Sequence, residues 1–183
     1  MDKTVFELFF SLLSLALLAG TIAVLVARLA YHRVGAAAAL IDGFRPLSRP
    51  LAAAVTTTCT LGSLYFSEIV GYVPCRLCWY QRAAMYPLAA ILIWFTVRRT
   101  ERIAFVTVPI AAIGGAISIY HWLYERWPAL DTGVCSKDVP CSSVWFETFG
   151  FVTLAFMAFT GFFATIVFTT LPPKNSSRTG AAQ

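Results

Sequence analysis

Five long runs of apolar residues, almost free of charge, constrain this chain more than any other feature of its sequence. Each is near the roughly 20 residues that a helix needs to cross about 30 Å of hydrocarbon. Within lipid a helix satisfies its own backbone hydrogen bonds, whereas the strands of a membrane barrel alternate in polarity over about 10 residues. The sequence therefore predicts an all-α membrane protein. The runs cover about Val5 to Ala27, Leu51 to Val73, Trp79 to Val97, Ile103 to Leu123 and Phe149 to Leu171.

The composition excludes the common soluble classes. Of the 183 residues, 58% are hydrophobic and 13% are charged, whereas soluble domains average about half apolar and a quarter charged. The net charge of +5 is compatible with nucleic-acid binding, but in a membrane protein basic residues gather on the cytoplasmic side. We therefore interpret the excess of basic residues as a sign of how the chain is oriented in a membrane, and not as a nucleic-acid binding surface.

The runs divide the chain into three parts. Residues 51–171 are predicted to form a four-helix transmembrane bundle, and residues 1–50 an extra N-terminal transmembrane helix with a cytoplasmic linker. Residues 172–183 are predicted to be a polar cytoplasmic tail, because two prolines stop the last helix. The first run differs from a secretory signal, because its basic residues follow the apolar stretch and its length exceeds the usual 7 to 15 or so.

The basic residues predict an orientation with the N-terminus outside and the C-terminus in the cytoplasm. Five spans alternate the loops so that nine basic residues and two acidic ones share one side, which we assign to the cytoplasm. The other side has five basic and seven acidic residues. The nine are Arg28, Arg33, Arg45, Arg49, Arg98, Arg99, Arg102, Lys174 and Arg178.

Four of the five cysteines fall on the outward side. Cys75 and Cys78 form a C-x-x-C motif at the start of a helix, and Cys135 and Cys141 lie in the last outward loop. An extracytoplasmic space permits disulfides, and the short spacings favour pairing within each motif. Cross-pairing between the motifs remains open. Cys59 lies inside a predicted span and is interpreted as a small buried hydrophobic residue.

These cysteines could be structural staples or zinc ligands, but a reactive pair fits the motif better. A C-x-x-C bridge closes too small a loop to constrain the unfolded chain much. Its sulfurs are expected near a helix N-terminus, where the dipole favours a thiolate, with Arg82 one turn beyond Cys78 on the same face. Zinc sites usually pair two short C-x-x-C-like motifs, whereas the loop pair here is C-x5-C.

The residues around the C-x-x-C motif carry a resemblance to a known family. Residues 75–82 read C-R-L-C-W-Y-Q-R, residues 85–87 read M-Y-P, and a second cysteine pair follows two helices later. This pattern resembles the disulfide-bond formation protein B family of bacterial membrane thiol oxidases, and within it the short-loop branch called BdbC. The resemblance covers about residues 51–171.

The resemblance implies a thiol:quinone oxidoreductase in the bacterial cell membrane. An extracytoplasmic thioredoxin-like oxidase of the DsbA or BdbD type would attack Cys135, and Cys141 would then attack Cys75. Cys78 would pass electrons as a thiolate to a bound ubiquinone or menaquinone. Arg82 matches the family's quinone-site arginine, and His121 matches a histidine near the quinone by its position at the end of a helix. Without the resemblance, His121 is either an interfacial anchor or a ligand.

Two alternative functions remain, and the sequence departs from the family pattern at two places. A vitamin K epoxide reductase-like enzyme uses the same chemistry, but its loop pair precedes its C-x-x-C motif. A non-enzymatic membrane scaffold with structural disulfides is the alternative from another class. Residues 1–50 lie outside the family core, and the loop pair is separated by five residues only.

Overall fold

The computed structural model describes residues 3–98, 103–130, 132–135 and 139–171. Within these residues the regular elements are all helices and there is no β-strand, which confirms the all-α prediction. The predicted tail at 172–183 and residues 99–102, which include the basic residues Arg99 and Arg102, lie outside the described residues. The helices are α1 Lys3–Leu29, α2 Gly35–Leu64, η1 Tyr65–Ile69, α3 Arg76–Arg98, α4 Ile103–Arg126, η2 Pro128–Leu130 and α5 Leu154–Thr169.

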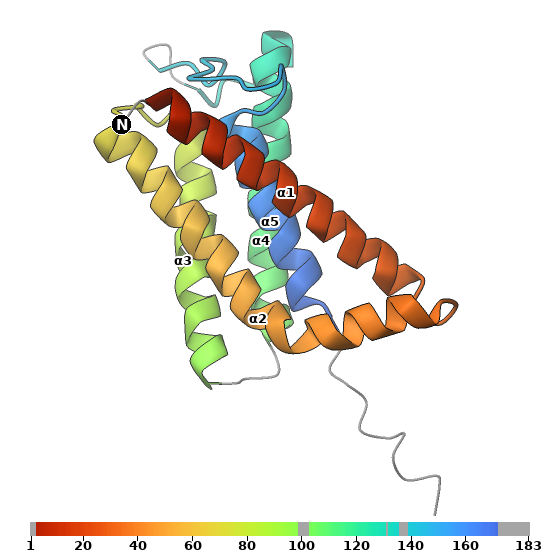
Figure 1. The fold of residues 1–183 in the computed structure, drawn as a ribbon. Coiled ribbons are helices and arrows are strands. Elements are labelled where there is room, and N and C mark those ends of the chain that lie inside the picture. The colour runs from red at the N-terminus through yellow and green to blue at the C-terminus, as the bar shows by residue number, and fades with distance from the viewer. Residues whose placement is uncertain (1–2, 99–102, 131, 136–138, 172–183) are drawn as a thin grey trace, which may run out of the picture.

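The helices form a bundle with α1 on its outside. Helix α4 packs against α3 and α5, and α2 packs against the same two helices. Helix α1 crosses the bundle obliquely and contacts α2 and α5 (Figure 1). The loop between α4 and α5 lies at the end of the bundle where α3 begins (Figure 1), so the two cysteine motifs meet at one end.

The bundle has an apolar surface as well as an apolar core, and hydroxyl side chains are buried among the core residues. Large apolar side chains such as Phe9, Trp94 and Phe105 are exposed. Buried positions hold hydroxyl side chains that donate to carbonyls one turn earlier in their own helices, as in Thr107 to Ile103 at 2.9 Å. Small hydroxyl residues are typical of contacts between membrane helices, because they let backbones approach and satisfy their own polarity. The buried set includes Ser11, Ser14, Thr21, Thr56, Thr107, Ser118, Thr160 and Thr165.

Two of the helices, α1 and α4, are long and apolar enough to cross a membrane by length and composition, and α5 is a shorter apolar helix. Helix α3 begins with a polar sequence that includes Arg76, Gln81 and Arg82. Helix α2 includes the polar stretch that precedes the predicted span. The count of five spans therefore stays a prediction.

Helix α2 begins sixteen residues before the predicted span, at Gly35 instead of Leu51. The alanine-rich sequence that follows Gly35 favours helix, and the two prolines inside α2, Pro46 and Pro50, do not end it. Prolines kink a helix because each lacks an N–H donor and crowds the preceding turn. In Figure 1 the first part of α2 lies across one end of the bundle and the second part runs beside α3.

Helix α5 begins later than predicted, at Leu154 instead of Phe149. Phe149 and Gly150 both have positive φ, at 57° and 76°, and an isolated bridge pairs Thr148 with Val152. This tight turn is incompatible with helix. The Thr153 side chain then caps α5 by accepting from the backbone N–H of Phe156 at 3.4 Å.

Close contact between α4 and α5 depends on Gly114. The Phe162 side chain is fully buried, and a Cβ at position 114 would lie 2.3 Å from its Cζ atom. The next residue, Gly115, has room, since a Cβ there would lie 3.6 Å from the Phe162 Cβ. Gly114 thus allows the ring to rest on the α4 backbone.

We expect Gly114→Ala to destabilise the bundle, because the added Cβ would overlap the buried ring of Phe162. Overpacking costs about 1–3 kcal/mol, which exceeds the gain of up to about 1 kcal/mol from replacing a helical glycine with alanine. Thermal unfolding of the purified protein measures the change in Tm. Gly115→Ala is the matched control and should leave Tm unchanged or raise it; equal Tm values for the two variants would contradict the packing.

Candidate active site

The C-x-x-C motif lies at the N-terminus of α3, as the sequence predicts. Cys75 immediately precedes the first residue of α3, and its Sγ accepts a hydrogen bond from the backbone N–H of Cys78 at 3.3 Å. Both cysteines are free thiols, and their sulfurs are 2.8 Å apart. The first turn of α3 therefore directs an N–H group at the Cys75 sulfur, where helix geometry favours negative charge.

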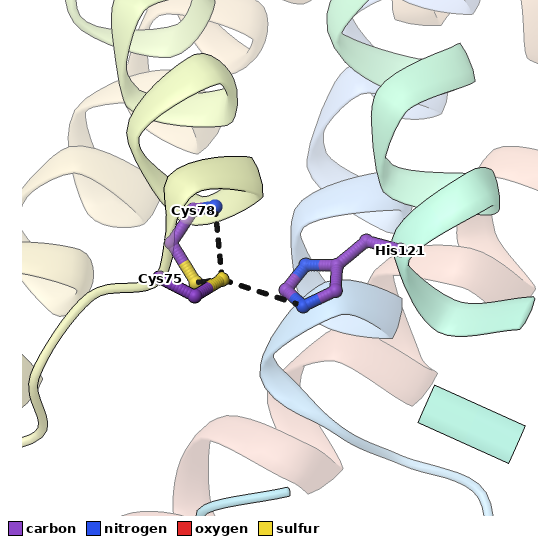
Figure 2. Close-up of side chains that lie close together, drawn as sticks. All are labelled: Cys75, Cys78 and His121. Carbon is purple, nitrogen blue, oxygen red and sulfur yellow. Dashed lines mark hydrogen bonds between the residues drawn. The ribbon is translucent and has the colours of Figure 1, made fainter. Parts of the chain in front are cut away.

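His121 reaches this pair from α4. Its Nε2 atom is 3.6 Å from the Cys75 Sγ (Figure 2). The ring is buried, and its Nδ1 atom is 3.0 Å from the Gln81 amide nitrogen. His121 is therefore part of the sulfur site and not an anchor at the surface.

The partners of His121 define its protonation at Nε2. This atom faces three acceptors: the Cys75 sulfur, the Cys141 carbonyl at 3.1 Å and a Glu125 carboxylate oxygen at 3.8 Å. A bare Nε2 would place a lone pair against all three, so Nε2 carries the proton. The Gln81 amide serves either charge state of the ring, because its N–H donates to a bare Nδ1 and its oxygen, after a half-turn, accepts from Nδ1–H.

These contacts lower the pKa of the Cys75 thiol from its ordinary 9.0 to about 4. The hydrogen bond from the Cys78 thiol is the main cause, and His121 contributes a further hydrogen bond and a positive charge. Burial acts in the opposite direction, because it penalises the charged form. In the reduced pair Cys75 is thus the more acidic of the two thiols.

The loop cysteines are joined to each other. A disulfide connects Cys135 to Cys141, which confirms the pairing favoured by the short spacing for the loop motif. The pairing favoured for Cys75 and Cys78 is not present, because these two cysteines are in the reduced state. Cys141 is fully buried next to Cys75, whereas Cys135 is partly exposed. The bond removes two of the thiolates that a four-cysteine zinc site would need.

Arg82 lies one turn beyond the sulfur pair and is held by α2. Its guanidinium donates to the Ser63 hydroxyl at 2.9 Å and to the Ser63 carbonyl at 3.0 Å. The guanidinium carbon also lies 5.2 Å from the centre of the Trp79 ring. This fork fixes Arg82 between α2 and α3, where its charge acts on Cys78.

A partly open apolar cavity of about 280 Å³ adjoins the site. That volume is suited to a ring system, since a water molecule occupies about 30 Å³ of liquid. Its polar lining includes Cys78, Gln81 and Arg82, whereas Cys75 does not line it. Tyr86 also lines the cavity, and its buried hydroxyl has no hydrogen-bond partner among the described residues. Cys59, left out of the site in the sequence analysis, is another lining residue.

The structure adds three residues that the sequence analysis did not assign to the site. Gln81 contacts His121, Glu125 lies 3.8 Å from it, and the Thr153 hydroxyl donates to Glu125 at 2.6 Å. The spacing of four residues between His121 and Glu125 was a signal for their shared helix face. No comparable signal exists for Thr153, because it comes from a distant segment.

We expect the Cys75 thiolate to persist to unusually low pH. In a reduced C-x-x-C pair the ultraviolet thiolate absorbance of Cys75 should be lost only as the pH falls through about 4, instead of near 9. His121→Ala removes a donor and a cation, so the midpoint should rise. Subtraction of the titration of Cys75→Ser isolates this thiol. A midpoint that His121→Ala does not move would contradict the role of the imidazole.

Comparison with known proteins gives a consistent result. The family model described as Disulfide bond formation protein DsbB matches residues 46–172. The chain is 44% identical over 117 residues to "Probable disulfide formation protein C 1" of Bacillus anthracis, which covers 63% of this chain and 84% of that protein. It is 46% identical over 110 residues to "Disulfide bond formation protein C" of Bacillus subtilis, covering 59% and 79% respectively. No solved structure matches.

Proposed function

Because the chain belongs to the DsbB family of disulfide bond formation proteins, we propose that it is a membrane thiol:quinone oxidoreductase. It would reoxidise an extracytoplasmic thioredoxin-like thiol oxidase, of the DsbA or BdbD type, and pass the electrons to a membrane quinone. The family itself implies membrane disulfide-bond formation. The quinone, the partner and the electron order are the parts of the proposal that require testing.

The position of the C-x-x-C pair supports this proposal most directly. Cys75 lies beside the buried loop cysteine Cys141, and Cys78 lines the apolar cavity. The two sulfurs are 2.8 Å apart, so a disulfide between them needs only a small movement. The pair therefore stands between a disulfide in a loop and a site suited to a lipophilic acceptor.

The proposed electron order follows from exposure and proximity. A thiolate of the partner attacks the Cys135 sulfur, the bond from Cys135 to Cys141 breaks, and Cys141 leaves as a thiolate. Cys141 then attacks the Cys75 sulfur of an oxidised C-x-x-C pair and releases Cys78 as a thiolate. The partner's second cysteine then attacks the partner's own sulfur in the mixed disulfide, which releases the oxidised partner and frees Cys135 as a thiolate. When Cys135 displaces Cys75 from Cys141, the loop disulfide re-forms and the C-x-x-C pair is left reduced, which is the redox state of the present structure.

The cavity fits the cofactor that the family resemblance implies. Its walls are mainly apolar, and its few polar groups include the Arg82 guanidinium and Gln81. A bound quinone would supply an acceptor for two electrons and two protons. Arg82 is held in place by Ser63 and is suited to hydrogen-bond a carbonyl oxygen. The Tyr86 hydroxyl, buried and without a described partner, is a further polar group on this wall.

Helix α1 closes one side of the same cavity. Phe10, Leu13, Ser14 and Leu17 line it, and a Cβ on Gly62 would lie 3.2 Å from the Phe10 ring. The family match begins at residue 46, so this wall is an addition to the matched core. We assign to α1 the role of shielding the cavity from lipid.

The proposed location is the bacterial cell membrane, crossed by the four-helix core and by α1. The N-terminus lies outside and the C-terminal tail in the cytoplasm, as the positive-inside distribution of basic residues favours. In this orientation both cysteine motifs are extracytoplasmic. The vitamin K epoxide reductase-like alternative has the opposite order of motifs, and no described contact favours the scaffold.

We expect Cys75→Ser and Cys78→Ser each to abolish quinone reduction while Tm stays close to that of the unchanged protein. The C-x-x-C pair contributes electron transfer but little chain constraint. The assay follows quinol formation from ubiquinone and from menaquinone with dithiothreitol as the electron source. Normal turnover by either variant would refute the proposed function.

The entry of electrons should be at Cys135, because it is the more exposed sulfur of the loop disulfide. A thioredoxin variant that keeps only the first cysteine of its own C-x-x-C motif is the probe, since it cannot resolve a mixed disulfide. We expect a covalent complex that peptide mapping assigns to Cys135 and that Cys135→Ser eliminates. A complex through Cys75 or Cys141 would reverse the proposed order.

A further inference from the structure

Glu125 is a buried carboxylate that the proposed electron path does not use. It lies in the last turn of α4, one turn beyond His121, and its side chain is 5% exposed. Taking a carboxylate out of water is costly unless partners compensate for the lost hydration. Its burial beside a redox site therefore calls for a reason.

The partners of Glu125 hold it in one position. One carboxylate oxygen accepts a hydrogen bond from the Thr153 hydroxyl at 2.6 Å, and the other lies 3.8 Å from the Nε2 atom of His121. Thr153 is itself buried and caps α5. Glu125 therefore joins the start of α5 to the imidazole that faces Cys75.

The charged groups around Glu125 come from α4, from Cys75 just before α3 and from the loop between α4 and α5. His121 and Arg126 attract the carboxylate from α4, whereas the Cys75 thiolate before α3 repels it. Arg126 also pairs with Glu147 at 3.1 Å, so part of its charge is already neutralised. The group nearest to Glu125 that gains a positive charge during thiol chemistry is thus the His121 ring.

We propose that Glu125 is a positioning residue for Cys75. Its carboxylate holds the His121 ring in place and stabilises the imidazolium, whose Nε2–H donates to the Cys75 thiolate. When the S–H bond of Cys75 breaks, its proton passes to solvent and the ring takes up a proton at Nδ1, so one S–H bond is exchanged for one N–H bond with no change in oxidation state. Gln81 accommodates the second ring nitrogen, since its amide oxygen accepts from Nδ1–H.

The inference rests on the proposed function, because it gives a role to the same thiol pair. It assigns Glu125 an electrostatic effect on the Cys75 thiol that a purely structural link between α4 and α5 would lack. An electrostatic role predicts that the Cys75 pKa changes in Glu125→Gln and is largely retained in Glu125→Asp, whereas a purely structural role predicts no such dependence on charge. Glu125→Gln retains an oxygen that can accept from Thr153 but loses the charge, whereas Glu125→Asp keeps the charge and shortens the reach.

The test is a titration of Cys75 in full-length protein that carries Cys59→Ala and Cys78→Ser, so that Cys75 is the one free thiol. Non-reducing peptide mapping checks that the loop disulfide is intact. We expect Glu125→Gln to raise the midpoint of the ultraviolet thiolate absorbance by about one pH unit, the lower end of the effect of a nearby opposite charge. Glu125→Asp should restore most of the shift.

Glu147→Gln is the matched control, because it removes the acidic charge that pairs with Arg126, and no described contact joins Glu147 to His121; the Cys75 midpoint should not move in this variant. An unchanged or lowered midpoint in Glu125→Gln would overturn the inference, the latter by showing that repulsion of the thiolate dominates. The titration contains no quinone. Its failure is therefore distinct from a failure of the proposed function, which would appear as absent quinol formation in the unmutated protein.

Discussion

The contact between His121 and Cys75 is the interaction on which the rest of the site depends. It joins the N-terminus of α3 to the C-terminal part of α4, and the Cys141 carbonyl on the same Nε2 atom brings in the loop disulfide. One turn of helix is about 5.4 Å long, so a slip of α4 by a single turn would separate these groups. The packing of Phe162 on Gly114 therefore matters for chemistry as well as for stability, because it sets where α4 lies on α5.

Local hydrogen bonding of hydroxyl groups helps thiol chemistry and an apolar cavity to coexist. Ser14 lines the cavity and donates to the Ser11 carbonyl of its own helix, and most of the other lining residues are apolar. The few polar groups near Cys78 are then held by specific partners, as Arg82 is by Ser63. Cys75 lies in a cluster with Cys141, and Cys78 packs against that cluster and also lines the cavity. Cys78 thus connects the loop disulfide side of the site with the cavity.

Much of this arrangement was predictable because it is encoded locally. The C-x-x-C spacing and the following apolar run predicted sulfurs at a helix N-terminus, and the six-residue separation of Cys135 and Cys141 favoured their disulfide. The starts of α2 and α5 were predicted wrongly. Hydropathy marks where a chain is apolar, but helix ends depend on prolines, caps and turns such as the one at Phe149 and Gly150.

The sequence by itself determined the all-α class, the reactive cysteine motif and its family, because apolar length, residue spacing and a short motif are properties of consecutive residues. The tertiary structure decided which side chains meet the sulfurs. Glu125 and Thr153 are brought together from α4 and the start of α5, and Arg82 is anchored by α2 instead of contacting Cys78 directly. Such contacts follow from the relative positions of packed helices, and packing is a property of the whole bundle that no local pattern records.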